Sequence, residues 1–130
     1  MYSCTTRSIK VTVVPAYLPD QSSALQDHFV WAYTIQLENV GSEVVQLINR
    51  YWHITDATGA VQEVHGAGVI GEQPVLQPGE VYQYSSGAAL QTSSGIMRGH
   101  YEMHTAEGEE FTIEIPAFSL DSPEQVSRPN

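Results

Sequence analysis

The sequence predicts an all-β protein, an antiparallel β-sandwich of seven strands or slightly more, of the fibronectin type III or immunoglobulin kind. Residues that suit a pleated strand (Val, Ile, Thr, Tyr, Phe and Trp) make up about a third of the 130 residues. Apolar and polar side chains alternate in several segments, with turn signals every eight to twelve residues. No segment shows a capped helical period. A closed β-barrel is the alternative architecture.

The clearest strand covers residues 29–38, where apolar side chains occupy every second position. The apolar residues on that face are Phe29, Trp31, Tyr33, Ile35 and Leu37. We expect the other strands at residues 9–14, 44–56, 60–65, 81–85, 97–105 and 111–115. Pro15 and Pro116 are expected to end the first and the last of these strands.

The segment 44–56 changes its apolar face midway. Val45 and Leu47 are apolar at odd positions, whereas Trp52 is apolar at an even one. One extra residue reverses the faces of a strand, so this pattern predicts a β-bulge near Asn49. Trp52 is then the side chain expected to fill the space between the sheets, although Trp31 competes for that role.

Length and composition indicate a single domain over residues 1–130, large enough for one core without disulfides or metals. We expect this core at about residues 8–120. Residues 121–130 hold two prolines and few apolar side chains, which indicates a flexible tail.

The net charge of −10 indicates which partners are excluded. Nucleic-acid binding normally needs a basic stripe, and anionic membranes also attract basic surfaces. The five basic side chains are instead spread along the chain: Arg7, Lys10, Arg50, Arg98 and Arg128. We therefore expect neither nucleic acid nor a membrane as a partner.

The lone cysteine and the first residues bear on the compartment. Cys4 has no second cysteine to pair with, and we expect it to lie in a mobile N-terminus. The first residues lack the basic and apolar regions of a signal peptide, and no apolar run approaches the ~20 residues of a spanning helix. A cytoplasmic location is expected.

Residues 66–71 match the pattern G-x-G-x-x-G through Gly66, Gly68 and Gly71. A dinucleotide-binding fold would need a helix directly afterwards, but Pro74 and Pro78 stand there, so we exclude that fold. Two interpretations remain open: the glycines permit a tight loop, or their amides form an anion-binding nest. The cations in the middle of the chain that could support an anion are Arg50 and Arg98.

A metal site is a further candidate, formed by His100, Glu102 and His104 on one face of a strand. Neighbours in this set lie ~6.7 Å apart and the outer two ~13 Å apart, so one ion could join only a neighbouring pair. His53 or His65 could complete such a site. The competing interpretation is the polar face that any half-buried strand needs.

Catalytic arrangements are absent from the sequence pattern. No G-x-S-x-G elbow occurs, and the pair Glu109–Glu110 flanks a turn where charge is ordinary solvation. We expect neither an enzyme nor a cofactor.

Several motifs in series carry a resemblance to a known family. They are Arg50-Tyr51-Trp52-His53-Ile54-Thr55-Asp56, the glycine segment from His65 to Pro74, Pro78-Gly79-Glu80, the segment from Ser94 to Met103, and the segment from Phe111 to Leu120. In this order they resemble the ApaG family from about Val11 to Leu120. The one departure, Ile70 where valine is commoner, is conservative.

The resemblance implies a fibronectin III-like sandwich without established catalysis, found as small cytoplasmic proteins of bacteria. The same domain in eukaryotic F-box proteins and in a polymerase-delta-interacting protein looks like a protein-interaction module. The bacterial family is associated with cobalt and magnesium homeostasis and is often encoded beside a diadenosine tetraphosphate hydrolase. Its glycine loop has prompted a pyrophosphate hypothesis, which here would concern Gly66, Gly68 and Gly71.

The function expected from this sequence is therefore that of a non-enzymatic binding module with a protein partner. An open sandwich has edge strands, and an edge strand can accept a partner peptide by β-augmentation. The alternative is a sensor that binds a pyrophosphate-containing nucleotide or a divalent cation.

Overall fold

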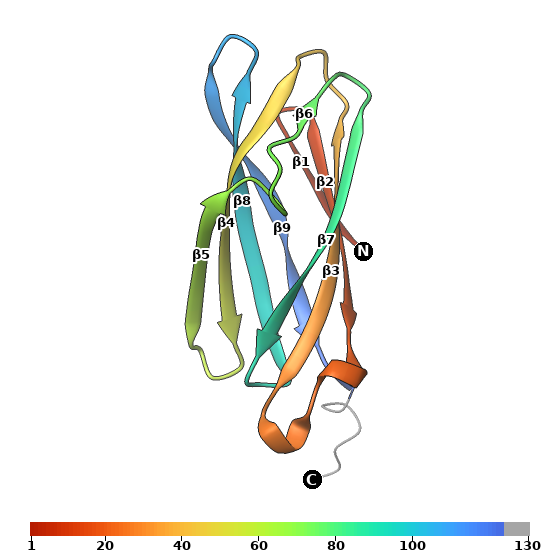
Figure 1. Ribbon diagram of the computed structural model, residues 1–130, viewed down its shortest axis with the longest axis vertical. Coiled ribbons are helices and arrows are strands. Elements are labelled where there is room, and N and C mark those ends of the chain that lie inside the picture. Colours follow the sequence, from red (N-terminus) through yellow and green to blue (C-terminus); the bar gives the residue numbers. More distant parts are fainter. Residues whose placement is uncertain (124–130) are drawn as a thin grey trace.

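The computed structural model describes residues 1–123 as two antiparallel sheets packed face to face (Figure 1). The four-stranded sheet has the order β1 (Tyr2–Thr6), β2 (Ile9–Tyr17), β3 (Phe29–Asn39), β7 (Val81–Leu90). The five-stranded sheet has the order β5 (Val61–Ala67), β4 (Val45–Asp56), β8 (Ser94–Thr105), β9 (Glu110–Asp121), and the short β6 (Val75–Leu76) also pairs with β4. The predicted sandwich is confirmed. The barrel alternative is wrong, because both sheets keep free edges.

The connection between β2 and β3 contains two short helical segments. They are the single-turn 3-10 helices Pro19–Gln21 and Ala24–Gln26. No helix within residues 1–123 has the length and apolar character needed to cross a membrane.

The core lies between the sheets, where the predicted alternation holds throughout β3. Both tryptophans belong to it: Trp31 is 1% exposed and Trp52 is 3% exposed. Trp52 makes edge contacts with Tyr33 and Phe118, at ring-centre distances of 5.3 and 6.0 Å. Both indoles therefore fill the space between the sheets, whereas the sequence suggested that one of them would.

The predicted bulge in β4 is present, since the pairing of β4 with β8 shifts between Leu47 and Asn49. A second shift, between β8 and β9 at Met97 and Gly99, was not predicted. It explains why Pro116 does not end the last strand. Pro116 lies opposite this irregularity, between the paired residues Ile115 and Phe118, where its missing N–H breaks no regular ladder.

Pro15 also lies inside a strand rather than at its end. Backbone bonds from Leu18 to Val30 (2.9 Å) and from Val40 to Ser8 (2.9 Å) show that even-numbered residues of β2 bond to β3. Odd-numbered residues consequently face β1, and β1 already ends at Tyr2 opposite Val13. The position of Pro15 therefore lies beyond the partner strand and needs no donor.

The N-terminus is a strand and not the mobile segment that we expected around Cys4. Side chains of β1 bond to the backbone of β9: Cys4 Sγ donates to Glu114 O (3.2 Å), and Glu114 N donates to Thr6 Oγ1 (3.3 Å). Tyr2 also packs on the core. These contacts close one side of the sandwich.

The C-terminal end is better packed than the sequence suggested. Asp121 is the last residue of β9, and Ser122 is only 1% exposed. The indole N–H of Trp31 donates to Asp121 O (2.9 Å) and holds this end of β9 against β3. The rest of the predicted tail, residues 124–130, lies outside the described residues.

Candidate functional site

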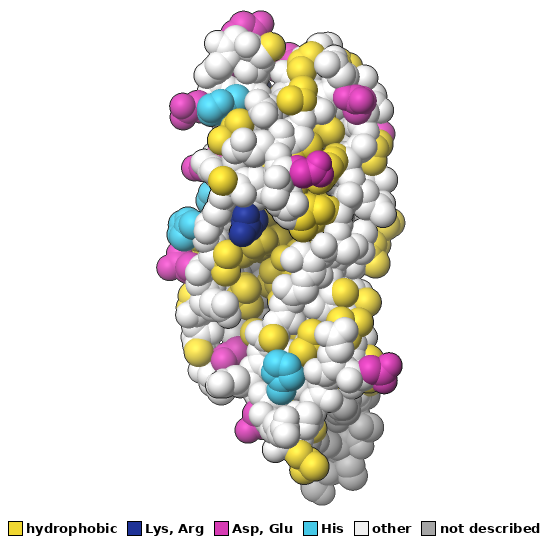
Figure 2. Space-filling model, viewed as in Figure 1, with side chains coloured by type: hydrophobic (Ala, Val, Ile, Leu, Met, Phe, Trp, Pro, Cys, Tyr) yellow, Lys and Arg dark blue, Asp and Glu magenta, His cyan; other side chains and the backbone are white. Residues whose placement is uncertain are grey.

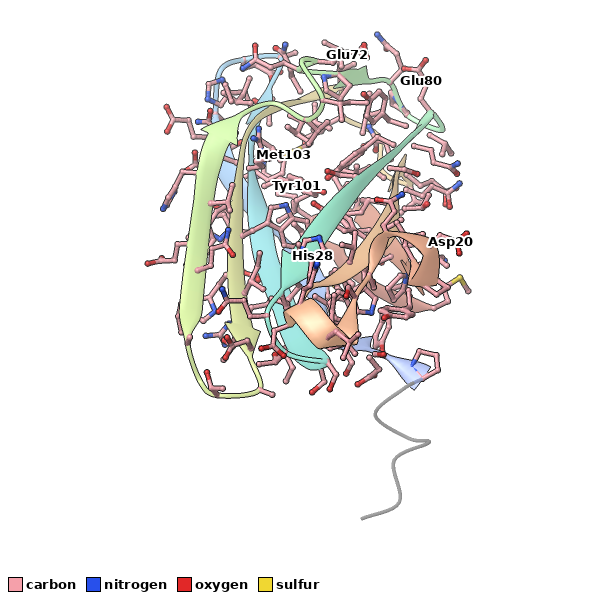
Figure 3. All side chains as sticks on the ribbon, turned by 60° about the horizontal axis from the view of Figure 1, so that its bottom comes forward. Asp20, His28, Glu72, Glu80, Tyr101 and Met103 are labelled. Carbon is pink, nitrogen blue, oxygen red and sulfur yellow. The ribbon has the colours of Figure 1, made fainter. Side chains whose placement is uncertain are left out.

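The side of the sandwich opposite β1 and β9 is bounded by the edge strands β5 and β7, and we call it the open side. Figure 2 shows hydrophobic side chains between the two sheets there, with one Lys or Arg side chain at the margin. Tyr101 and Met103 of β8 point into the space behind this opening (Figure 3), and both are 0% exposed.

The free edge of β7 presents backbone groups of alternate residues. Asn39 N donates to Glu80 O (3.0 Å), which shows that even-numbered residues at this end of β7 face β3. Backbone bonding alternates along an antiparallel strand, so the odd-numbered residues face away from β3. The residues that present N–H and C=O to the open side are Val81, Gln83, Ser85, Gly87 and Ala89.

β7 carries none of the usual devices that protect an edge. Its ten residues include no charged residue and no proline, and its pairing with β3 continues without a bulge from Val81 to Leu90. The other edge of the open side differs, since β5 carries Glu63. The unprotected edge is therefore β7.

Arg50 of β4 points toward the other sheet because it follows the bulge. Its Nη1 donates to Ala67 O (3.1 Å) and Gly68 O (3.0 Å), so the guanidinium holds the end of β5. Within residues 1–123 no carboxylate pairs with Arg50. The ion pairs there are Arg7 with Glu43 and Glu109, and His104 with Glu110.

A hollow of about 180 Å³ opens beside Arg50, and we call it the Arg50 hollow. Its walls come from both sheets and from the glycine loop: Tyr33, Arg50, Trp52, Val69, Ile70, Tyr84 and Ser86. Burial raises the pKa of Tyr33 and Tyr84, and the positive charge of Arg50 acts against this rise in both. The phenols therefore stay neutral near pH 7, and Arg50 is the charged group of the hollow.

Deeper in the core, the hydroxyls of Tyr84 and Tyr101 bond to each other. Tyr101 is fully buried, and burial raises its pKa well above the ordinary value. This pair connects the two sheets behind the hollow.

The glycine loop forms a tight turn rather than a cofactor site. Val69 and Glu72 exchange two backbone bonds (2.8 and 2.9 Å), and the two residues between them have positive φ, 42° at Ile70 and 80° at Gly71. This is the backbone of a two-residue hairpin turn of type I′. No helix follows, since β6 comes next, so the exclusion of a dinucleotide fold is confirmed.

Three amides of the glycine loop donate to carbonyls of the same chain. Gly68 N donates to Ile48 O (2.8 Å), while Val69 N and Glu72 N take part in the turn. Gly68, with φ of 62°, could not carry a Cβ, which would lie 2.2 Å from Glu72 O. The geometry thus favours the tight-loop interpretation of these glycines over the anion nest.

Arg98, the second predicted anion ligand, is not near the glycine loop. It is exposed on the outer face of the five-stranded sheet, opposite His53. The structure therefore brings Arg50 to Gly66 and Gly68 but leaves Arg98 on the other face.

The predicted metal ligands lie on the same outer face, as their alternation indicated. Each has its own contact: His100 stacks on Tyr51 (4.8 Å between ring centres), Glu102 accepts from Asn49 Nδ2 (2.8 Å), and His104 lies 3.9 Å from Glu110. Among residues 1–123, no three His, Cys, Asp or Glu side chains gather closely enough to hold an ion.

Tyr51 is the centre of this outer face. His65 lies on the other side of Tyr51, with 4.8 Å between the ring centres, and the Tyr51 hydroxyl donates to Glu63 Oε2 (2.6 Å). That bond to Glu63 raises the pKa of Tyr51. The adjoining surface is hollowed by about 470 Å³ between Arg50, His65, His100 and Glu102.

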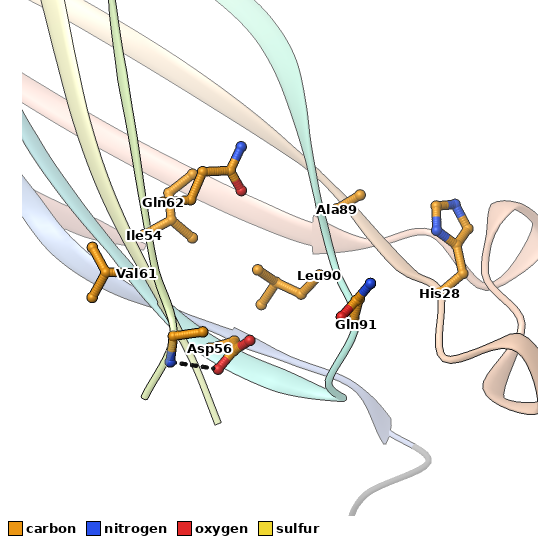
Figure 4. Close-up of a pocket in the computed structure, with 9 residues that line it drawn as sticks. His28, Ile54, Asp56, Val61, Gln62, Ala89, Leu90 and Gln91 are labelled. Atoms are coloured by element: carbon orange, nitrogen blue, oxygen red, sulfur yellow. Dashed lines mark hydrogen bonds between the residues drawn. The ribbon is translucent and has the colours of Figure 1, made fainter. Parts of the chain in front are cut away.

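A further hollow of about 300 Å³ opens on the open side at the far end of β7, and we call it the Leu90 hollow (Figure 4). Ile54 of β4 and Leu90 of β7 provide its apolar walls, and Val61 lies at its rim. Asp56 Oδ1 accepts from Ala60 N (3.1 Å) and fixes the hairpin that borders it.

Part of this site could be found in the sequence. A bulge near Asn49 that turns Trp52 and Ile54 inward also turns Arg50 inward, since all three have even numbers. No sequence signal placed Ser86 or Tyr33 beside that cation, because both depend on how the two sheets face each other.

The fold and its open side define a β-sandwich of the fibronectin type III or immunoglobulin kind. The chain belongs to the ApaG domain family, whose family model matches residues 19–105. It is 62% identical over 123 residues to Protein ApaG of Parvibaculum lavamentivorans, covering 95% of both chains. It is 61% identical over 130 residues to Protein ApaG of Paramagnetospirillum magneticum, covering 100% of both.

A solved structure shows the same architecture. The crystal structure of the ApaA protein from Bordetella pertussis superposes with a TM-score of 0.86 at 45% identity, over 88% of this chain and 94% of that chain. The predicted family and fold are confirmed.

Proposed function

We propose that this protein is a non-catalytic binding module that docks an extended segment of a partner protein as an added strand on β7. The observation that carries this proposal is the bare edge of β7, ten residues long and without charge, proline or bulge. Such an edge presents unpaired backbone donors and acceptors to an extended chain, and β-augmentation uses them.

The two sides of the sandwich differ in a way that supports docking on β7. On the closed side, Thr6 and Tyr2 of β1 accept bonds from the backbone of β9. On the open side, the Arg50 hollow and the Leu90 hollow both adjoin β7. A strand added there would therefore meet side-chain recesses as well as backbone groups.

The titratable groups within residues 1–123 support a non-enzymatic role. Burial raises the pKa of the Cys4 thiol, whose Sγ already donates to Glu114 O, so Cys4 is a weak nucleophile. Burial likewise keeps Tyr84 and Tyr101 protonated. The Cys4 thiol bonds to a backbone carbonyl and the two phenols bond to each other, and none of these partners is a base that could activate a nucleophile.

The expected cytoplasmic location is compatible with this proposal. The association of the family with cobalt and magnesium homeostasis is also compatible with it, if the partner protein provides that association. No three metal-ligating side chains come together in residues 1–123, so we infer that the association runs through the docked protein.

A small-ligand sensor is the second candidate, favoured by the cation Arg50 beside Gly66 and Gly68. Titration with diadenosine tetraphosphate, inorganic pyrophosphate, cobalt or magnesium, followed by NMR, separates the candidates. Shifts confined to residues 66–71 would favour an anion sensor, and shifts at 100–104 would favour a metal sensor. Silence at both places favours the interaction module.

Strand addition is tested by selecting a phage library of random twelve-residue peptides on the protein and on two variants. Gln83 faces away from β3, so Gln83→Pro removes one outward N–H and leaves the β3 ladder intact. Gln83→Ala changes the same side chain and keeps the N–H. We expect enriched peptides to bind the wild type and Gln83→Ala alike, and Gln83→Pro at least tenfold more weakly.

Two outcomes would contradict the proposal. One is a library that yields no enriched peptide on the wild type. The other is a set of peptides that bind Gln83→Pro as well as Gln83→Ala, since these would not use the edge of β7.

A further inference from the structure

We propose that the segment docked on β7 carries an aspartate or glutamate whose carboxylate enters the Arg50 hollow and pairs with Arg50. This inference rests on the proposed strand addition and names the chemistry that the partner must supply. It assigns Arg50 to partner recognition rather than to a nucleotide.

The register of an added strand determines which of its side chains reach Arg50. Side chains directly opposite each other on neighbouring strands point to the same face of a sheet. Tyr84 and Ser86 of β7 line the Arg50 hollow. The partner residue opposite Tyr84 or Ser86 therefore points into this hollow as well.

The guanidinium has hydrogen-bonding capacity left for such a residue. Nη1 of Arg50 is occupied by Ala67 O and Gly68 O, and residues 1–123 offer no acceptor to its Nε or Nη2. These two nitrogens form one edge of the planar group, which matches the two oxygens of a carboxylate. The two carbonyls orient Arg50 but leave its charge unneutralised.

The size of the Arg50 hollow favours the end of a side chain over a small molecule, and the hollow of about 470 Å³ that Arg50 also lines includes no residue of β7. Pockets that hold small molecules occupy roughly 300–1,000 Å³. The Arg50 hollow is about 180 Å³, which is too small for a nucleotide. Its lining includes the buried side chains of Trp52 and Tyr33.

The overall charge favours a carboxylate over a phosphorylated residue. The chain has a net charge of −10 and therefore repels anions at long range. A single negative charge is repelled less than a phosphate dianion. Arg50 lies in the recess without a neighbouring Lys or Arg, so it can balance one charge but not two.

The Leu90 hollow extends the motif. Leu90 lies four residues from Ser86 and faces the same side of β7, and with Ile54 it forms an apolar recess (Figure 4). A strand that places a carboxylate opposite Ser86 places the residue four positions away over this recess. The expected partner motif is an acidic residue and an aliphatic residue with three residues between them.

Two phage libraries test this inference, identical except for a fixed central Glu in one and a fixed central Gln in the other. Selection on the wild type is expected to enrich the Glu library at least tenfold over the Gln library. On Arg50→Gln the two libraries should be enriched equally. On Gln83→Pro neither should be enriched, because that variant lacks the edge bond.

A second variant and a direct signal guard against a structural effect of Arg50→Gln. Ser86→Leu narrows the hollow while Arg50 keeps its bonds to Ala67 and Gly68, and it should also lose the preference for Glu. In NMR spectra the Nε–Hε resonance of Arg50 should shift with an enriched Glu peptide and stay in place with its Gln counterpart.

The outcomes separate the two proposals. Equal enrichment of both libraries on the wild type, lost on Gln83→Pro, would overturn the carboxylate and keep strand addition. Enrichment of the Glu library that persists on Gln83→Pro would overturn strand addition and leave an acidic ligand of Arg50. A Glu preference that persists in Arg50→Gln would overturn the role of Arg50.

Discussion

Gly66 and Arg50 lie so close that the glycine has no room for a side chain. A Cβ at position 66 would lie 2.7 Å from Cζ, Nη1 and Nη2 of Arg50. The first glycine of the G-x-G-x-x-G segment thus accommodates a cation of the same protein. A different constraint requires glycine at each of the three positions, and alanine substitutions can distinguish these constraints.

We expect a graded loss of stability when the three glycines are replaced by alanine. Gly68→Ala should cost about 3 kcal/mol, because φ is 62° and the Cβ would collide with Glu72 O. Gly71→Ala should cost about 1 kcal/mol, since φ is 80° but the space is open. Gly66→Ala should cost about 1 kcal/mol, because the flexible Arg50 can move away.

Urea denaturation of the three variants measures this order. Gly66→Ala should also displace the Nε–Hε resonance of Arg50, whereas Gly71→Ala should leave it unchanged. Equal costs for Gly68 and Gly71 would show that the contact with Glu72 O is relieved by a shift of the loop.

Ile70→Asn is expected to stabilise the protein by about 1 kcal/mol. Ile70 has φ of 42°, a left-handed conformation that strains a β-branched residue, and asparagine tolerates it better. The side chain is 58% exposed, so little burial is lost. Ile70→Val keeps the branching and serves as control, with unchanged stability. If Asn and Val behave alike in urea denaturation, the strain is not the determining factor.

Asp56 should make stability depend on acid pH. Its Oδ1 accepts bonds from Thr58 Oγ1 (2.7 Å), Thr58 N (2.8 Å) and Ala60 N (3.1 Å). These bonds, chiefly the one from the Thr58 side chain, lower the pKa of Asp56 in the folded state. The contribution is therefore complete above the unfolded pKa of about 4 and is lost as pH falls through the lower folded value.

The matched variant is Asp56→Asn, which keeps the acceptor oxygen and cannot titrate. The unfolding free energies of wild type and variant, measured from pH 7 to pH 2, should converge as the pH falls below about 4. A difference that stays constant over this range would show that the carboxylate charge contributes nothing to the turn.

Trp52→Ala should destabilise the protein by about 3–5 kcal/mol, the usual cost of removing a large buried aromatic side chain. Trp52 is 3% exposed and contacts Tyr33 and Phe118. The measurement is the urea midpoint at an unchanged m value. A midpoint close to that of the wild type would mean that the surrounding rings close the cavity.

The sequence predicted the sandwich because its strands alternate with a period of two, and that period follows from local backbone geometry. The same rule located the bulge near Asn49. Where a residue depends on a neighbouring strand, the local pattern fails. In the sequence, Pro15 and Pro116 indicate the ends of strands. Both lie inside strands, at positions where a backbone N–H would have no regular partner, and these positions are determined by the pairing with β1 and β8.

The candidate site shows the same division. Arg50 was predicted, like Arg98, as a mid-chain cation that could support an anion, and its inward direction follows from the bulge. Arg98 was grouped with it only because both are mid-chain cations, and the sheet separates them by placing Arg98 on the other face. The bare edge of β7 could be recognised only from the strand order, because a strand is an edge when no strand pairs with one of its two sides.

The hydrogen-bonded hydroxyls of Tyr84 and Tyr101 are expected to stabilise the fold as a pair. Either single substitution, Tyr84→Phe or Tyr101→Phe, leaves one buried hydroxyl without its partner and should cost about 1–3 kcal/mol. The double variant removes both hydroxyls, so its cost should be smaller than the sum of the two single costs. Urea denaturation at pH 7 measures the unfolding free energies of the wild type, the two single variants and the double variant, and these four values give the coupling between the two hydroxyls.

Alkaline pH provides an independent measure of the same pair. Burial raises the folded pKa of both phenols above the unfolded value of about 10, so their neutral forms stabilise the fold fully below that pH. This stability is lost as the pH rises further, because the unfolded chain releases the protons first. The double variant should therefore lose less stability than the wild type between pH 9 and pH 11. Parallel curves would mean that the two hydroxyls ionise in the folded protein as readily as in the unfolded chain.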